Sequence, residues 1–223
     1  MNQKRKTYFL CSTCFLLAFA VWTVLVSTVD VRPIGPRGSC VGFSAFNGAF
    51  HGLTGVSLWL YNLTDWLGLL PIATALGFAV WGCVQWIRRK SILRVDRSLL
   101  ALGAFYVAVL LVYLLFEQIP VNYRPVLIGG ALEVSYPSST TVLVVSVMLG
   151  SYLQCVPYLK GRAVRIGTKL FVAAFVGFMV VGRALSGVHW ISDIIGGLLI
   201  SLALVAAYAG AIEKNERQCG CAE

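Results

Sequence analysis

Charged side chains are scarce in this sequence. Only 9 acidic and 18 basic residues occur among 223, so charged residues make up 12% of the chain, while 58% are hydrophobic. A water-soluble domain of this length cannot hide so much apolar surface in one core. The composition therefore excludes a soluble enzyme, a disordered chain and a collagen-like chain. It indicates an integral membrane protein, and at about 20 residues per span the length allows five or six membrane helices.

The sequence also lacks a cysteine framework, and it has only two histidines, His51 and His189. Its seven cysteines are an odd number, and most lie inside apolar runs, which does not fit a set of disulfides. Cys11 and Cys14 have a metal-like spacing, but no other ligands accompany them. We interpret them as apolar filling.

Six apolar runs of 16 to 23 residues are long enough to cross the hydrocarbon layer of a membrane. They cover residues 7–29, 67–87, 99–116, 138–158, 170–185 and 191–211. The first run has a basic start and an Ala18-Phe19-Ala20 triplet, as a signal peptide would, but it continues to Val29, so a cleavage site there would be buried. We therefore predict an anchor and an all-α fold, an integral membrane six-helix bundle in which residues 1–223 form a single membrane domain.

Lysine and arginine are divided unevenly between the two sides of the membrane. With the N-terminus inside, 14 of the 18 basic residues fall in the inside segments 1–6, 88–98, 159–169 and 212–223. This bias predicts a multi-pass protein of the cell membrane with both termini in the cytoplasm. The net charge of +9 then reflects topology and contact with anionic lipids, and we expect no nucleic-acid partner.

The outer segment 31–66 joins the first two spans. It opens with two prolines and becomes rich in aromatic residues and glycine, so it is too interrupted to span a membrane. Phe43, Phe46, Asn47 and Phe50 have helical spacing. We predict an interfacial helix along the outer headgroups, with a packed loop over the bundle as the alternative.

A small set of charged residues remains at the outer ends of spans three to six: Glu117, Arg124, Glu133, Arg183, His189 and Asp193. Charge near a membrane is costly, so such residues usually pair or take part in chemistry. His189 and Asp193 are four residues apart, which places them on one face of a helix. We expect the Asp193 carboxylate to accept a hydrogen bond directly from one His189 nitrogen and to leave the other free to attack. A structural cap on the span is the alternative.

Two neighbouring stretches indicate that an anion binds near His189. Arg183 lies six residues before it, across a short turn, and the guanidinium fork matches phosphate oxygens. The stretch 136–141, Tyr-Pro-Ser-Ser-Thr-Thr, precedes an apolar span, and a helix start of this kind exposes N–H groups and hydroxyls. Ordinary capping is the alternative interpretation of that stretch.

Together these stretches resemble the three motifs of the type 2 phosphatidic acid phosphatase superfamily of membrane lipid phosphatases. The family patterns, in order, are Lys-x6-Arg-Pro, Pro-Ser-Gly-His and Ser-Arg-x5-His-x3-Asp. Here they read Glu117-x6-Arg124-Pro125, Pro137-Ser138-Ser139-Thr140 and Gly182-Arg183-x5-His189-x3-Asp193. The likeness covers about residues 99–211, and residues 63–68 are similar to the bacterial, Gram-positive branch.

The resemblance implies a role for each matching position. His189 would be the nucleophile that forms a phosphohistidine, and Asp193 would orient it. The phosphate would be held by Arg124, Arg183, Ser138 and Ser139. No metal and no cofactor is implied, because two arginines and a helix N-terminus can neutralise the charge that develops on the phosphate oxygens.

Two departures from the family pattern affect the chemistry. Glu117 replaces the lysine of the first motif, where a carboxylate cannot clamp phosphate, and we expect it to pair with Arg124 or Arg183 instead. Thr140 replaces the histidine that acts as general acid, and general acid catalysis is typically worth ~100- to 10,000-fold. His51 is an alternative acid on the same side, although an interfacial or capping role suits it better.

Two further replacements, Ser139 for glycine and Gly182 for serine, are expected to be tolerated. An engineered, disabling change at Thr140 is an alternative to a natural replacement, since the rest of the site is intact.

The leading hypothesis is an outer-leaflet lipid phosphatase acting on undecaprenyl pyrophosphate, phosphatidylglycerophosphate or phosphatidate. A phosphate leaving group needs a proton less than an alcohol does, so Thr140 favours the pyrophosphate. The competing hypothesis is a non-catalytic descendant that binds or transports a phospholipid headgroup. Glu117 and Thr140 favour this second hypothesis, and the retained pair of His189 and Asp193 opposes it.

Overall fold

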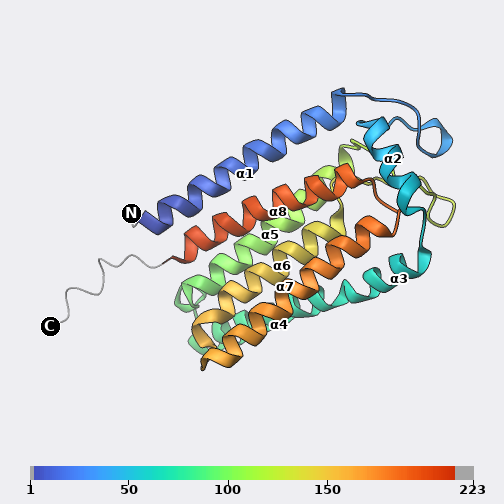
Figure 1. Ribbon diagram of the computed structural model, residues 1–223. Coiled ribbons are helices and arrows are strands. Elements are labelled where there is room, and N and C mark those ends of the chain that lie inside the picture. The colour runs from blue at the N-terminus through green and yellow to red at the C-terminus, as the bar shows by residue number, and fades with distance from the viewer. Residues whose placement is uncertain (1–2, 214–223) are drawn as a thin grey trace.

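The computed structural model describes residues 3–213, and this part of the chain is almost entirely helical (Figure 1). Three isolated antiparallel bridges are its only β-type pairing. The helices are α1 (Gln3–Thr28), α2 (Ser44–Thr54), α3 (Leu58–Leu67), α4 (Leu69–Arg89), α5 (Arg97–Gln118), α6 (Ser139–Cys155), α7 (Arg162–Leu185) and α8 (Ile191–Ile212).

Six stretches within these residues are long and apolar enough to cross a membrane. They are α1, α5, α7, α8, α6 with the turn that follows it, and α3 and α4 taken together. The prediction of an all-α membrane bundle is confirmed. The fifth span, helix α7, begins at Arg162, eight residues before the expected start at residue 170. Its first turns carry basic side chains, and such residues extend a helix past the hydrocarbon layer because their charged ends reach the interface.

The segment between the first two spans forms two short helices where one was predicted. Phe46, Asn47 and Phe50 fall in α2, and Phe43 is the residue just before it. The chain then breaks at Gly55, where φ is 63°. Ser57 starts α3 by accepting a hydrogen bond from the Leu60 N–H. Asn47 is buried against the bundle, whereas Trp59 is mostly exposed. The segment therefore combines a packed inner face with an aromatic outer face.

Helix α8 lies at the centre of the bundle, beside α1, α5 and α6 (Figure 1). Small residues allow this close packing, as in other membrane bundles. A Cβ at Gly196 would come within 2.6 Å of the Tyr136 ring, and one at Gly197 within 3.1 Å of Thr141. These glycines bring the start of α8 against the start of α6.

The bundle has two ends. The loop end carries the segment 29–68, the connection 119–138 and the turn 186–190 (Figure 1). The terminal end carries Gln3 and Ile212 together with the connections 90–96 and 156–161. The connection 119–138 folds back on itself through the bridges Tyr123↔Val134 and Ile128↔Ala131. All of the sequence-predicted site residues lie at the loop end.

Candidate functional site

The turn between α7 and α8 carries His189 and is held from several sides. Gly187 has a φ of 67°, and a Cβ there would lie 1.9 Å from the Gly55 carbonyl oxygen, so the turn requires glycine. The His51 ring donates to the Gly187 carbonyl at 3.2 Å. The Trp190 indole donates to the Tyr123 carbonyl at 2.7 Å. His51 therefore supports the turn, in agreement with a capping role.

Ser135 lies between His189 and Asp193. Its hydroxyl is 2.9 Å from Nδ1 of His189 and 2.6 Å from Oδ2 of Asp193, and all three side chains are buried. The predicted direct hydrogen bond between His189 and Asp193 is therefore wrong. Asp193 instead turns back to the start of its own helix, where Oδ2 accepts from the Trp190 N–H at 3.1 Å, while Oδ1 accepts from Asn122 at 2.9 Å.

These contacts determine which nitrogen of His189 is free. The single proton of the Ser135 hydroxyl goes to Asp193, so the hydroxyl oxygen accepts from Nδ1–H, and Nε2 keeps its lone pair. Burial, and then the charges of Arg124 and Arg183, hold the pKa of His189 well below its ordinary value. The resting ring is therefore neutral and has the protonation state of a nucleophile.

Arg183 reaches Nε2 of His189 from the end of α7. Its Nη2 donates to Nε2 at 3.3 Å, and its Nη1 donates to Thr64 at 3.4 Å. The guanidinium also lies 4.9 Å from the centre of the Tyr61 ring and 3.7 Å from Asp65. The contacts with Thr64, Tyr61 and Asp65 come from α3. Residues 63–68 resemble the bacterial branch, but their spacing gave no sign that α3 contacts Arg183. A Cβ at Gly182 would come within 2.8 Å of Thr64, so this packing favours glycine where the motif that the sequence resembles has serine.

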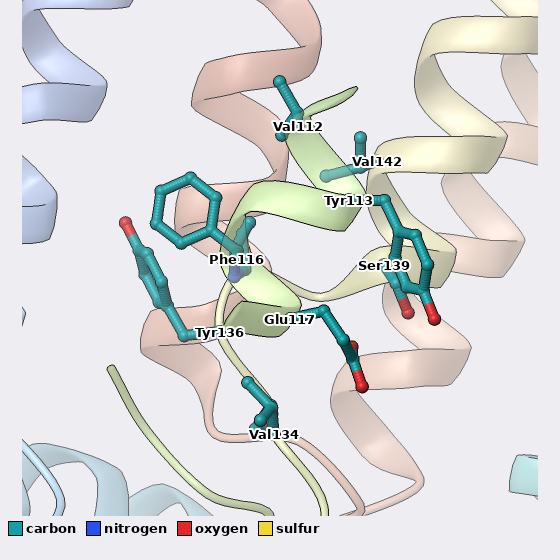
Figure 2. Close-up of a pocket in the computed structure, with 10 residues that line it drawn as sticks. Val112, Tyr113, Phe116, Glu117, Val134, Tyr136, Ser139 and Val142 are labelled. Carbon is teal, nitrogen blue, oxygen red and sulfur yellow. The ribbon is translucent and has the colours of Figure 1, made fainter. Parts of the chain in front are cut away.

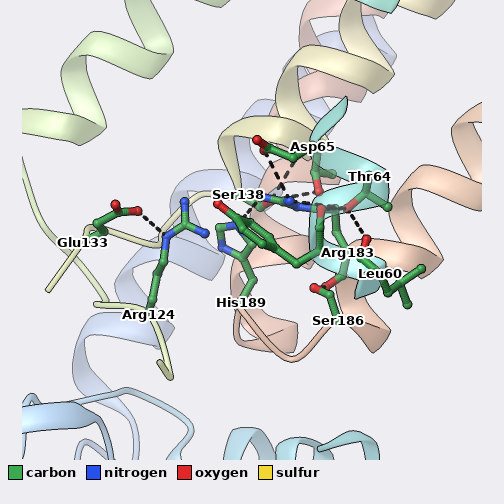
Figure 3. A network of polar contacts seen from close by, with 11 residues as sticks. Leu60, Thr64, Asp65, Arg124, Glu133, Ser138, Arg183, Ser186 and His189 are labelled. Carbon is green, nitrogen blue, oxygen red and sulfur yellow. Dashed lines mark hydrogen bonds and ion pairs between the residues drawn. The ribbon is translucent and has the colours of Figure 1, made fainter. Parts of the chain in front are cut away.

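Arg124 approaches His189 from the opposite side, on the connection 119–138. Figure 3 shows its guanidinium between Glu133 and the His189 ring. Its Nε lies 3.0 Å from Glu133 Oε2, an ion pair whose geometry falls short of a hydrogen bond. Nε and Nη1 of Arg124 and Nε of Arg183 are buried without a hydrogen-bond partner. Buried guanidinium groups with unused donors on two sides of one nucleophile form a cradle for an anion.

The serines at the start of α6 occupy different surroundings. Ser138 caps the helix, accepts from the Thr141 hydroxyl at 3.0 Å, and donates its N–H to the Asp193 carbonyl at 3.1 Å. That N–H is thus already engaged in packing α6 against α8. Ser139 instead lines a small pocket with Glu117, Tyr113 and Ser135 (Figure 2).

Glu117 is exposed at the end of α5 and pairs with neither arginine of the site. The carboxylates beside Arg124 and Arg183 are Glu133 and Asp65. The expected pairing of Glu117 is therefore wrong. Glu117 is 16 residues before Glu133 in the sequence, and only the fold-back of the connection decides which of them faces Arg124.

Thr140 lines an apolar groove of about 410 Å³ between α4, α5 and α6. The groove shares Tyr113, Ser139 and Val142 with the small pocket that reaches Ser135. The groove and the small pocket therefore lie side by side, and the small pocket is lined by Ser135, the residue that contacts His189. Within residues 3–213, no group of three or more metal-ligating side chains comes together.

No protein-family model matches the sequence, and a search of curated proteins gives no match. Among solved structures, the fold is similar to the crystal structure of the first transmembrane PAP2 type phosphatidylglycerolphosphate phosphatase from Bacillus subtilis, with a TM-score of 0.59. The similarity covers 90% of this chain and 94% of that chain, at 15% identity. It shows a shared fold, the one that the three sequence motifs implied.

Proposed function

We propose that this chain is a membrane lipid phosphatase that removes a terminal phosphate through a covalent histidine intermediate. One observation carries the proposal: the neutral Nε2 of His189 lies between two buried arginines that keep unused N–H donors. A cradle of this kind suits a phosphate, and a nucleophile beside it suits group transfer.

In the first step, the phosphate takes the guanidinium donors and Nε2 attacks phosphorus. The N–P bond forms while the bond to the leaving oxygen breaks, and that oxygen takes the electron pair. The ring then carries a positive charge, with Nδ1–H still donated to Ser135. The Asp193 carboxylate stabilises this charge through the Ser135 hydroxyl.

In the second step, water attacks phosphorus, the N–P bond breaks, and Nε2 recovers its lone pair. The water proton leaves with phosphate or to solvent, so orthophosphate and the lipid product balance the reaction. The arginines hold the developing negative charge in both steps, and such stabilisation is usually the largest contribution to catalysis.

The substrate class follows from the leaving group and the groove. The Thr140 hydroxyl is too weak an acid to protonate a leaving group near neutral pH. A pyrophosphate lipid needs that proton less than a monoester does. Undecaprenyl pyrophosphate is therefore our first candidate, with phosphatidylglycerophosphate, the substrate class named for the similar structure, and phosphatidate after it. The apolar groove that Thr140 lines would hold the hydrocarbon tail. The inward bias of basic residues supports a site at the outer leaflet of the cell membrane.

The test is phosphate release by the purified protein in micelles, with each of these three lipids. We expect slow release that is abolished by His189→Ala. His51→Ala removes only a contact that supports the turn, so it should lower release without abolishing it. Acid-labile phosphate on the protein after brief reaction would identify the intermediate. Lipid binding without release on any substrate would instead support a non-catalytic binder or transporter, the alternative that Glu117 and Thr140 favour.

A further inference from the structure

Each buried arginine of the site faces an exposed carboxylate. Arg183 is 1% exposed and Arg124 9%. Their partners are far more open, with 41% of the Glu133 side chain and 61% of the Asp65 side chain exposed. A buried charge needs a counterion, but ion pairs with so exposed a partner are weak.

The geometry of both pairs is loose. Glu133 lies 3.0 Å from Nε of Arg124 without completing a hydrogen bond. Asp65 lies 3.7 Å from Nη1 of Arg183, which donates to Thr64 at 3.4 Å. Neither carboxylate takes up all the donors of its arginine. Both arginines are therefore neutralised without being saturated.

We propose that Glu133 and Asp65 are stand-in counterions, which neutralise the site arginines while the site is empty and yield them to an incoming phosphate. The proposal rests on the proposed function in that the ligand is a phosphate. The carboxylates are the exposed members of the two pairs, so they can turn into water at little cost. The arginines cannot, because they are enclosed by α3, α7 and the connection 119–138.

This exchange has two consequences for the reaction. It sets a threshold, because an anion must outcompete two carboxylates before it reaches His189. The phosphodiester groups of ordinary membrane lipids carry one negative charge, whereas a terminal phosphate near neutral pH carries close to two. It also helps product release, since the carboxylates return to the arginines when orthophosphate leaves.

The test measures binding of orthophosphate to the purified protein in micelles, by calorimetry and by the rise in unfolding temperature with phosphate concentration. Glu133→Gln should tighten binding about 10-fold and Asp65→Asn about 3-fold, because the Asp65 pair is longer and more exposed. Asp30→Asn is the matched control. Asp30 pairs with Arg32 at 2.8 Å at the same end of the bundle, so its loss should leave phosphate binding unchanged.

A second ligand, dimethyl phosphate, shows whether the carboxylates are displaced by the anion or stay in place and repel it. If the carboxylates are displaced, Glu133→Gln should tighten orthophosphate and dimethyl phosphate by similar factors. If they stay in place and only repel, the gain for the dianion should be about the square of the gain for the monoanion.

Glu133→Asp keeps the charge but shortens the side chain, so it should give an intermediate gain in phosphate affinity. It is the test variant if Glu133→Gln folds poorly. Unchanged or weaker phosphate binding in a folded Glu133→Gln protein would overturn the proposal, and so would an equal gain in Asp30→Asn. None of these readouts needs turnover. A protein that releases no phosphate from lipids but binds it more tightly in Glu133→Gln would therefore refute the phosphatase and keep the exchange.

Discussion

Two buried polar networks lie at opposite ends of the bundle, and they differ in whether their donors are used. At the terminal end, Gln154 donates to Ser98 at 3.2 Å and accepts from Tyr208 at 2.7 Å, so both polar atoms of its amide are paired. At the loop end, Arg124 and Arg183 keep buried N–H groups without a partner. A neutral, saturated network holds helices together, whereas a charged, unsaturated one retains capacity for a ligand.

The largest expected effect concerns the general acid that the loop end lacks at position 140. Thr140→His should raise phosphate release from a monoester lipid by about 100-fold or more, because an imidazole can donate a proton to the leaving oxygen near neutral pH. The gain should be smaller on a pyrophosphate lipid. Release is measured from phosphatidate and undecaprenyl pyrophosphate side by side. No gain on either lipid in a folded Thr140→His protein would instead favour the non-catalytic binder.

Ser135→Ala should lower kcat by about 10- to 100-fold and change KM little, because it breaks the link from Asp193 to His189 without touching the arginines. Ser135→Thr keeps the hydroxyl and should recover part of the rate. The kcat values of both variants and their dependence on pH provide the measurement. A fall in kcat without recovery in a folded Ser135→Thr protein would indicate a packing role for Ser135 alone.

Gln154→Leu should act on the other network and leave catalysis alone. It removes the partner of the buried Tyr208 hydroxyl, and an unsatisfied buried group costs about 1–3 kcal/mol. Unfolding in micelles and phosphate release are measured on the same preparation. Loss of activity without loss of stability would show that the network at the terminal end is not purely structural, which would contradict the comparison.

Lowering the pH should decrease the free energy of unfolding through the protonation of His189 in the unfolded chain. Its pKa in the folded protein is well below the ordinary value, mainly because of burial, whereas the unfolded chain has a pKa near 6.5. Below about pH 6.5 the unfolded chain therefore binds a proton that the folded chain does not, and stability falls by up to about 1.4 kcal/mol per pH unit. Unfolding temperatures from about pH 8 to pH 5 should fall less steeply in His189→Gln. Equal slopes would show that His189 is not the group responsible.

The smallest effect concerns the groove beside the site. Ala75→Trp fills part of it and should raise KM for a long-chain lipid about 5-fold, with little change for a short-chain analogue. Ala73→Trp, on the exposed face of the same helix, is the matched control. Equal effects of the two tryptophans on KM would show that the groove does not bind the hydrocarbon tail of the substrate.

The order and approximate extent of the six long helices could be read from the sequence, because a membrane span needs a continuous apolar run and its length is set by the bilayer. Arg183, His189 and Asp193 could also be assigned to one end of the bundle. They lie within 11 residues of one another around a single turn, so their proximity depends on local geometry.

The partners of these residues depend on packing between distant segments. Ser135 is 58 residues from Asp193 in the sequence, and Thr64 is 119 residues from Arg183. Helical spacing predicts which side chains share a face of one helix, but not which loop is folded against that face. The apolar runs and the turn were therefore determined by the sequence. The tertiary structure decided that Ser135 separates His189 from Asp193, and that Glu133 and Asp65, not Glu117, neutralise the arginines.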